Sequence, residues 1–174
     1  MKKINIIFEQ IEPVENLSQV IKDTFDVDLD ISGGWGYDNK RPVIVHSLQM
    51  PIDQFIHMFA MIRANIEMNL TLEEDERYGG INVAFIDGKQ FEVENKVYDM
   101  ITFKITAMKE KDYAKFIQEY KDNYGKNSDF DMNDHFKRRE AASLSIEADY
   151  WFSGLEAYYH IEDGMDQEPK DGLK

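Results

Sequence analysis

The feature that most constrains this fold is a pair of alternating apolar runs on either side of Asp87-Gly88. Residues 81–86 precede the pair and residues 89–93 follow it, and both runs place apolar side chains at every second position. A period of two is typical of a β-strand with one buried face. An Asp-Gly pair between two such runs is a strong hairpin signal, because both central turn positions need a positive φ. The sequence therefore predicts a hairpin that turns at Asp87-Gly88.

The alternation continues through residues 97–107, which predicts an antiparallel β-meander over 81–108. Short alternating runs predict further strands at 3–9, 26–31 and 43–45. Apolar residues at helical spacing predict helices at about 14–25, 51–70 and 110–123, and a helix-rich region at 133–159. This succession favours an α+β fold, in which one mostly antiparallel sheet is packed by several α-helices.

The length of the chain fits one domain. The chain has 174 residues, and a single hydrophobic core commonly serves chains of this size. We expect the domain to span residues 1–160, and we expect residues 161–174 to form a mobile acidic tail, because they lack apolar periodicity. No window reaches the roughly 18 apolar residues of a membrane span, and the N-terminus lacks the apolar stretch of a signal peptide. The expected protein is cytoplasmic and does not contact a membrane.

Charge narrows the class of partner. The chain holds 34 acidic and 20 basic residues, a formal net charge of −14. Such a charge repels phosphate backbones and anionic membranes, and it attracts basic proteins. The strongest basic patch, Lys137-Arg138-Arg139, is followed at once by Glu140. We therefore interpret it as a solvated helix face, and we expect no binding to nucleic acid.

No pattern of residues identifies a catalytic or metal site. The chain has no cysteine, which excludes disulfides and thiol chemistry. No two histidines lie within four residues of each other, so none forms a local metal-binding pair. Asp26, Asp28 and Asp30 resemble the start of a calcium loop, but its sixth and twelfth positions hold Ile31 and Tyr37 instead of Gly and Glu. We expect no catalytic residue, no metal, no cofactor and no enzymatic activity.

Two segments carry the most distinctive surface chemistry. One is an acidic run followed by a tyrosine, and the other is an aromatic residue pair in a Gly-rich loop. Clustered carboxylates speed association with a basic partner, and aromatic side chains often form the desolvated centre of an interface. Each segment also has a structural explanation, since the run can be a solvated loop and Trp35 can fold back onto the core. The predicted partner-binding residues are Trp35, Tyr37, Asp38, Glu73, Glu74, Asp75, Glu76 and Tyr78.

Part of the chain resembles small immunity proteins of polymorphic toxin systems, including contact-dependent growth inhibition. The resemblance covers residues 26–108 and includes the acidic strand, the Ser32-Gly33-Gly34-Trp35-Gly36-Tyr37-Asp38 loop, the Val43-Ile44-Val45 strand and the apolar helix at 51–70. It lies in the succession of elements rather than in a diagnostic motif, so no binding residue is carried over. It implies a cytoplasmic inhibitor that binds the catalytic domain of a toxin, often a basic nuclease, in a stoichiometric complex. The net charge points separately to a basic partner.

Two other classes of protein fit the same chain. A small acidic secretion chaperone or adaptor shares its size and charge, and would expose an apolar groove for a client. An enzyme whose carboxylates meet only in the folded state would show a cleft with strongly shifted carboxyl pKa values. Dimerisation would favour the chaperone, whereas one-to-one binding would favour the inhibitor.

Overall fold

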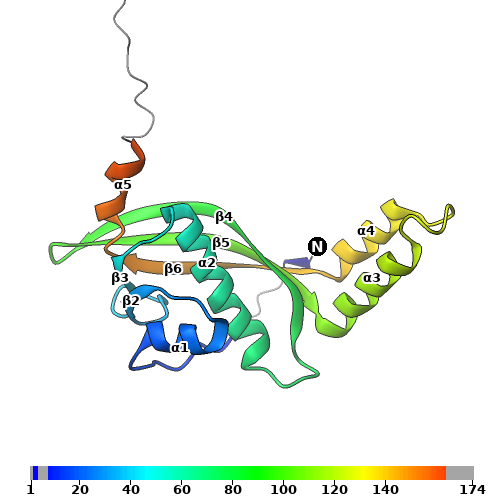
Figure 1. The fold of residues 1–174 in the computed structure, drawn as a ribbon, viewed down its shortest axis with the longest axis horizontal. Coiled ribbons are helices and arrows are strands. Elements are labelled where there is room, and N and C mark those ends of the chain that lie inside the picture. The colour runs from blue at the N-terminus through cyan, green and yellow to red at the C-terminus, as the bar shows by residue number, and fades with distance from the viewer. Residues whose placement is uncertain (1, 4–7, 164–174) are drawn as a thin grey trace, which may run out of the picture. The chain divides into compact units, whose positions relative to one another are not determined.

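The computed structural model describes residues 2–3 and 8–163, and it confirms a single α+β domain (Figure 1). Its sheet is mixed but mostly antiparallel, with the strand order β2-β3-β6-β5-β4, and β1 pairs with β6. The strands are β1 (Lys2–Lys3), β2 (Asp30–Gly33), β3 (Val43–Ser47), β4 (Tyr78–Val93), β5 (Lys96–Lys109) and β6 (Leu144–Ser153). The helices are α1 (Leu17–Phe25), α2 (Ile52–Asn65), the π-helix η1 (Ile66–Leu70), α3 (Glu110–Asn123), α4 (Met132–Ala142) and α5 (Glu156–Asp163).

The domain consists of two compact units, each built from several stretches of chain. Unit 1 comprises Met1–Glu12, His57–Asp87 and Thr102–Asp149, and unit 2 comprises Pro13–Ile56, Gly88–Ile101 and Tyr150–Lys174. No helix in the described part of the chain is long and apolar enough to cross a bilayer.

The core of unit 2 forms where α1 and the short strands meet. Leu17 and Ile21 of α1 are buried, and so is Val43 of β3, which pairs in parallel with Phe152 of β6. The ring of Phe55 from α2 meets that of Phe152 edge to face, with centroids 5.9 Å apart. Burial alternates along β3, because Val43 and Val45 are buried whereas Ile44 and His46 are exposed, so one face of the strand packs on the core.

The predicted helix at 14–25 and strand at 26–31 both begin later than expected. Asn16 caps α1 by accepting a hydrogen bond from the Gln19 amide at 3.0 Å, so the helix starts at Leu17. Asp26 ends it in the left-handed region with φ 55°. Because that conformation breaks the extended backbone, β2 starts only at Asp30.

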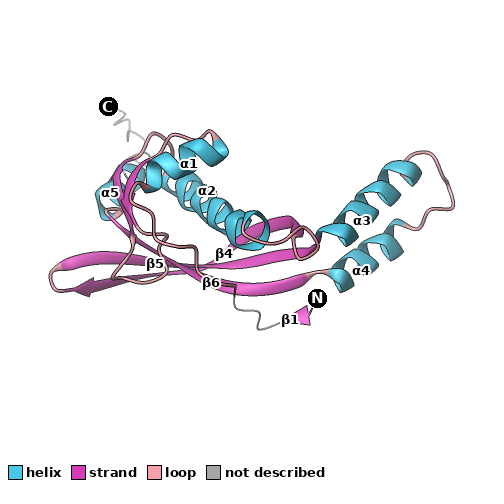
Figure 2. Cartoon of the chain, turned by 90° about the horizontal axis from the view of Figure 1, so that it is seen from below, coloured by secondary structure: helices cyan, strands magenta, loops and turns pink. Residues whose placement is uncertain are grey.

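The core of unit 1 lies between α2 and β5. Phe103, Ile105 and Ala107 of β5 are buried at alternate positions, as a strand requires. The ring of His57 from α2 approaches that of Phe103 edge to face, and Phe59 and Met68 of the helical segment are buried as well. The predicted helix at 51–70 is confirmed as α2 with η1. The predicted helix at 110–123 is confirmed as α3, and α4 lies antiparallel beside it (Figure 2).

The hairpin is confirmed, but the predicted turn at Asp87-Gly88 is wrong. Strand β4 runs through both residues, and the chain turns at Glu94 and Asn95, whose φ values are 52° and 61°. The predicted three-stranded meander is therefore formed by two long strands, β4 and β5, which are neighbours in the sheet.

The helix-rich prediction for 133–159 is wrong between Leu144 and Ser153, which form β6. Leu144 and Phe152 occupy helical spacing in the sequence, but the residues from 150 to 152 are consecutive aromatics that favour a strand. Pairing with β3 and β1 then selects the extended form.

The two ends of the chain are described only in part. Of the predicted first strand at 3–9, the structure shows Lys2–Lys3 paired in parallel with β6, while Phe8 and Glu9 lie outside any strand and residues 4–7 fall outside the described part. The predicted tail begins inside α5, which ends at Asp163, and residues 164–174 lie outside the described residues.

Candidate functional site

The acidic run follows an irregular helix end in unit 1. After Asn65 the helix widens into η1, where the Thr71 amide donates to the Ile66 carbonyl at 3.1 Å, five residues back. The Thr71 hydroxyl donates to the same carbonyl at 2.8 Å. Short π-helical turns of this kind occur frequently at functional sites. Here the turn ends the helix and starts the segment that carries Glu73 to Glu76.

A buried ion pair fixes the base of this segment. Arg63 Nε lies 3.1 Å from Glu67 Oε1, one helical turn away, and both side chains are buried. Arg63 Nη2 also donates to the Asp149 carbonyl of β6 at 2.8 Å. The pair joins the end of α2 to the sheet, and removing either partner would leave a buried charge uncompensated.

Two cations beside the acidic run bind backbone carbonyls. Lys109 Nζ donates to the Glu76 carbonyl at 2.9 Å and lies 4.3 Å from the centroid of the Tyr78 ring. Arg77 Nε donates to the Leu72 carbonyl at 3.1 Å. These contacts hold the loop, and they leave the side chains of Glu73, Glu74, Asp75 and Glu76 exposed.

A cavity of about 660 Å³ lies between this loop and the N-terminal segment. Half of its lining residues are glutamates, and apolar side chains from both segments complete the wall. The lining residues are Phe8, Glu9, Gln10, Ile11, Glu12, Glu67, Thr71, Leu72, Glu73 and Glu76. We call this the acidic cavity. Its volume falls within the roughly 300–1,000 Å³ of ligand sites in proteins.

Only part of the predicted acidic segment belongs to this cavity. Glu73 and Glu76 line it, whereas Glu74 and Asp75 are exposed and lie outside the lining. Tyr78 is buried, and its ring meets that of Phe8 edge to face with centroids 5.6 Å apart. Tyr78 therefore supports the wall from behind.

The aromatic loop belongs to unit 2, and its side chains have structural roles. Trp35 is only 2% exposed and forms part of the core. Asp38 Oδ1 accepts hydrogen bonds from the amides of Lys40 and Arg41, each at 2.9 Å, and so closes the loop as a side-chain turn. Tyr37 is half-buried. Trp35 and Asp38 therefore stabilise the fold of this loop, as the alternative to partner binding predicted for Trp35.

The remaining polar clusters are occupied by internal contacts. Lys22 pairs with Asp26 and with Asp28 at 2.9 Å each, and the two carboxylates raise the pKa of Lys22. The Asp30 carboxylate accepts from Ser47 Oγ at 2.7 Å. Within the described residues, no group of three or more His, Asp or Glu side chains could hold a metal ion.

Two of the three residues of the basic patch, Arg138 and Arg139, make contacts within the protein. Arg138 contacts Glu119 through both terminal nitrogens, and its Nε lies 2.7 Å from Asp134 Oδ2. Hydrogen bonds from Arg138 hold the pKa of Glu119 below its ordinary value. Arg139 lies over the Tyr113 ring at 5.8 Å.

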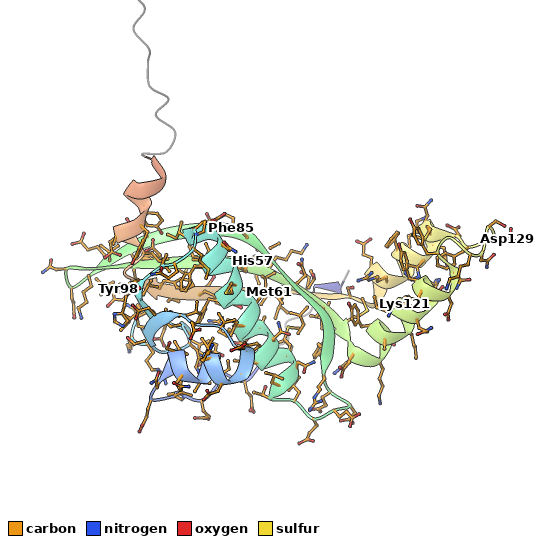
Figure 3. All side chains as sticks on the ribbon, viewed as in Figure 1. His57, Met61, Phe85, Tyr98, Lys121 and Asp129 are labelled. Carbon is orange, nitrogen blue, oxygen red and sulfur yellow. The ribbon has the colours of Figure 1, made fainter. Side chains whose placement is uncertain are left out.

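The histidines lie in separate surroundings. His46 shares a 2.7 Å hydrogen bond with Ser32, and His135 is buried between α3 and α4. His57 of α2 and Phe85 of β4 are labelled in Figure 3. Their rings both approach that of Phe103 edge to face, with centroids 6.4 and 6.3 Å apart. The side chain of His160 lies outside the described part.

Sequence reasoning missed the N-terminal wall of the acidic cavity. Glu9 and Glu12 are more than fifty residues from Glu67 in the chain, and nothing in their local spacing links them to it. The acidic residues at and just after the end of the predicted strand 3–9 were the signal that could have drawn attention to this segment.

The chain matches no protein-family model, and comparisons with curated proteins and with solved structures found no match. A function for this chain therefore has to be inferred from its own surface chemistry.

Proposed function

We propose that this chain is a cytoplasmic immunity protein that neutralises a cognate basic toxin domain, such as a nuclease, by forming a stoichiometric complex. The acidic cavity is the observation that carries the proposal. Glutamates from two distant segments line it, in a chain whose formal net charge is −14. A concave site with carboxylates over apolar walls fits a lysine or arginine side chain of a protein partner.

The two kinds of lining residue suit the two parts of such a side chain. The methylene stem of a lysine or arginine packs on apolar surface, here Phe8, Ile11 and Leu72. The charged head binds carboxylates, and arginine can do so with two parallel hydrogen bonds. The carboxylates of Glu73 and Glu76 lie on the loop side of the cavity, where a partner would meet them.

This binding mode would also inhibit a nuclease. A nuclease holds the phosphates of its substrate with cationic side chains, and each phosphate contact contributes to its affinity. Carboxylates that occupy those cations compete with the phosphates. The negative field of the bound inhibitor repels nucleic acid from the complex.

The experiment uses the basic domain of a secreted protein encoded next to this chain. Co-expression should protect cells from that domain, and the purified proteins should form a one-to-one complex. The double variant Glu73→Gln/Glu76→Gln should dissociate faster and raise the Kd about tenfold or more, because two charge-assisted hydrogen bonds are lost.

The same loop provides a matched control. Glu74→Gln/Asp75→Asn removes the same number of charges outside the lining of the cavity, and should leave the dissociation rate close to that of the wild type. Equal dissociation rates for the two double variants would show that the cavity is not the binding site. A toxin domain that remains active in the complex would contradict the function itself.

One observation favours a secretion chaperone as the second candidate. Phe85 and Ile86 of β4 are 60% and 44% exposed, which offers apolar surface to a client. A chaperone would bind an unfolded client with an affinity that falls on Phe85→Ser and is unchanged in Glu73→Gln/Glu76→Gln. The inhibitor gives the opposite pattern with a folded partner.

A further inference from the structure

Asp99 of β5 is a buried carboxyl group with an incomplete set of partners. Its side chain is 3% exposed. Oδ1 accepts hydrogen bonds from Tyr159 Oη at 2.8 Å and from Gln90 Nε2 at 3.3 Å. Oδ2 is buried and has no hydrogen-bond partner among the residues that the structure describes. Buried polar atoms of this kind are uncommon in native proteins and require an explanation.

The donor Tyr159 belongs to α5, the last helix that the structure describes. Tyr158 of the same helix donates from its hydroxyl to the His46 carbonyl at 3.3 Å, and Leu155 before the helix is buried. Among the described side chains, two tyrosine hydroxyls of α5 and the apolar side chain that precedes the helix make these contacts within unit 2. Segments held by few buried apolar contacts are typical of those that open locally.

A fixed pivot precedes the helix. Gly154 has φ +92°, and a Cβ at this position would lie 2.5 Å from the Val45 carbonyl oxygen. Only glycine tolerates this close approach in this region of φ. The backbone is thus anchored to β3 at the start of α5, and motion of the helix would begin after this residue.

The protonation state of Asp99 changes the free energy of the arrangement in which Tyr159 of α5 is hydrogen-bonded to it. A neutral carboxyl leaves one buried hydroxyl without an acceptor, whereas a carboxylate leaves one buried charged oxygen without a donor, which costs more. The groups that face Asp99 are Gln90 on β4 and Tyr159 and Glu156 on α5. Burial raises the pKa of Asp99 and the charge of Glu156 raises it further, while hydrogen bonds from Tyr159 and Gln90 lower it.

We propose that α5 is a pH-controlled latch, which Tyr159 holds over Asp99 while that carboxyl is protonated and which opens as Asp99 ionises. Opening would transfer the carboxylate from a dry environment into water. The donor stays protonated throughout, because burial and Asp99 raise the pKa of Tyr159.

The sign of the pH dependence follows from the raised pKa. The closed state binds the Asp99 proton more tightly than the open state, in which the carboxyl titrates near its ordinary value of about 3.9. Closure is therefore favoured at acidic pH. It weakens as the pH rises from about 4 to the raised pKa, by about tenfold for each pKa unit of the shift.

Hydrogen exchange of the full chain tests the latch. Protection factors of the amides in 156–163, corrected for the intrinsic pH dependence of exchange, should fall as the pH rises. In Asp99→Asn, which keeps a neutral side chain at every pH, they should stay constant. In Tyr159→Phe they should be lower than in the wild type at acidic pH, where the wild-type latch is closed.

Two controls separate the latch from general unfolding. Amides of α3 belong to unit 1 and should keep their protection in all variants. Tyr158→Phe also removes a tyrosine hydroxyl from α5 but leaves Asp99 untouched, so its pH dependence should match the wild type. A wild-type pH dependence in Asp99→Asn would overturn the proposal. If Asp99→Asn also exposes α3, unchanged protection in Tyr159→Phe would overturn it instead.

Discussion

At the residue scale, Trp35 is of a residue type that often anchors interfaces, but its side chain lies in the core. Its side chain is 2% exposed. The adjacent Gly36, with φ +76°, accepts a hydrogen bond from the Trp151 amide at 2.8 Å through its carbonyl. A Cβ at Gly36 would lie 2.8 Å from the Trp151 carbonyl oxygen, so the loop backbone lies directly on β6. This close contact holds the indole ring inside unit 2.

Trp35→Ala should therefore reduce folding stability. Removal of a fully buried aromatic side chain costs about 3–5 kcal/mol through lost burial and the cavity that remains. Chemical denaturation would measure the loss as a lower midpoint with an unchanged slope. Tyr37→Ala, two residues along in the same loop and only half-buried, should cost clearly less. A wild-type midpoint for Trp35→Ala would contradict the core assignment.

At the element scale, the turn between β4 and β5 contains two non-glycine residues with a positive φ. Asn95 tolerates its φ of 61°, as asparagine often does, but Glu94 holds a φ of 52° without a comparable preference. A non-glycine residue in this region costs about 1–2 kcal/mol. The turn therefore stores strain that a better residue would relieve.

Glu94→Asn should stabilise the hairpin by up to about 1 kcal/mol, because asparagine suits the first central position of this turn. Thermal unfolding would show a higher Tm than the wild type. Glu92→Asn, which removes the same charge within β4, should give no such rise. A Tm that falls in Glu94→Asn would contradict the placement of the turn.

Periodicity alone predicts an element correctly where only one of the two periods, that of a helix or that of a strand, fits the residues. The helices at 52–70 and 110–123 and the strand at 43–47 have one clear period each. Residues 144–155 do not, since Leu144, Ala148 and Leu155 fit a helix while the aromatic run at 150–152 fits a strand. Pairing with β3 and β1 decides between them, and this pairing joins residues more than a hundred positions apart. The local sequence does not predict this pairing.

In the candidate site, too, the part that depends on local sequence could be predicted and the part that depends on tertiary packing could not. The loop side of the acidic cavity could be predicted, because Glu73 to Glu76 form a continuous run after an apolar helix. The opposite wall, Phe8 to Glu12, reaches the cavity only through tertiary packing such as that of Phe8 on Tyr78. The acidic character of the site could thus be predicted from the sequence, but its concave form could not.

At the scale of the whole molecule, the net charge of −14 acts before any contact is made. Under the proposed function, a field of this sign would steer a basic partner toward the protein and raise the association rate, while short-range contacts in the cavity would set the dissociation rate. The two contributions differ in their response to salt. Screening shortens the reach of the field to about 10 Å at 0.1 M ionic strength, but it affects partly buried pairs much less.

Charge reversal outside the cavity should therefore change association alone. Glu74→Lys/Asp75→Lys shifts the net charge by four units on exposed side chains that do not line the cavity. With the cognate basic domain, the wild type should associate quickly at low salt and slow toward the roughly 10⁵–10⁶ M⁻¹s⁻¹ of unsteered pairs as salt rises. The variant should start slower and show a flatter salt dependence, with a dissociation rate near that of the wild type. Stopped-flow mixing across a salt series measures both rates. Association that is independent of salt in the wild type would mean that the charge of this protein has a purpose other than recognition of a basic partner.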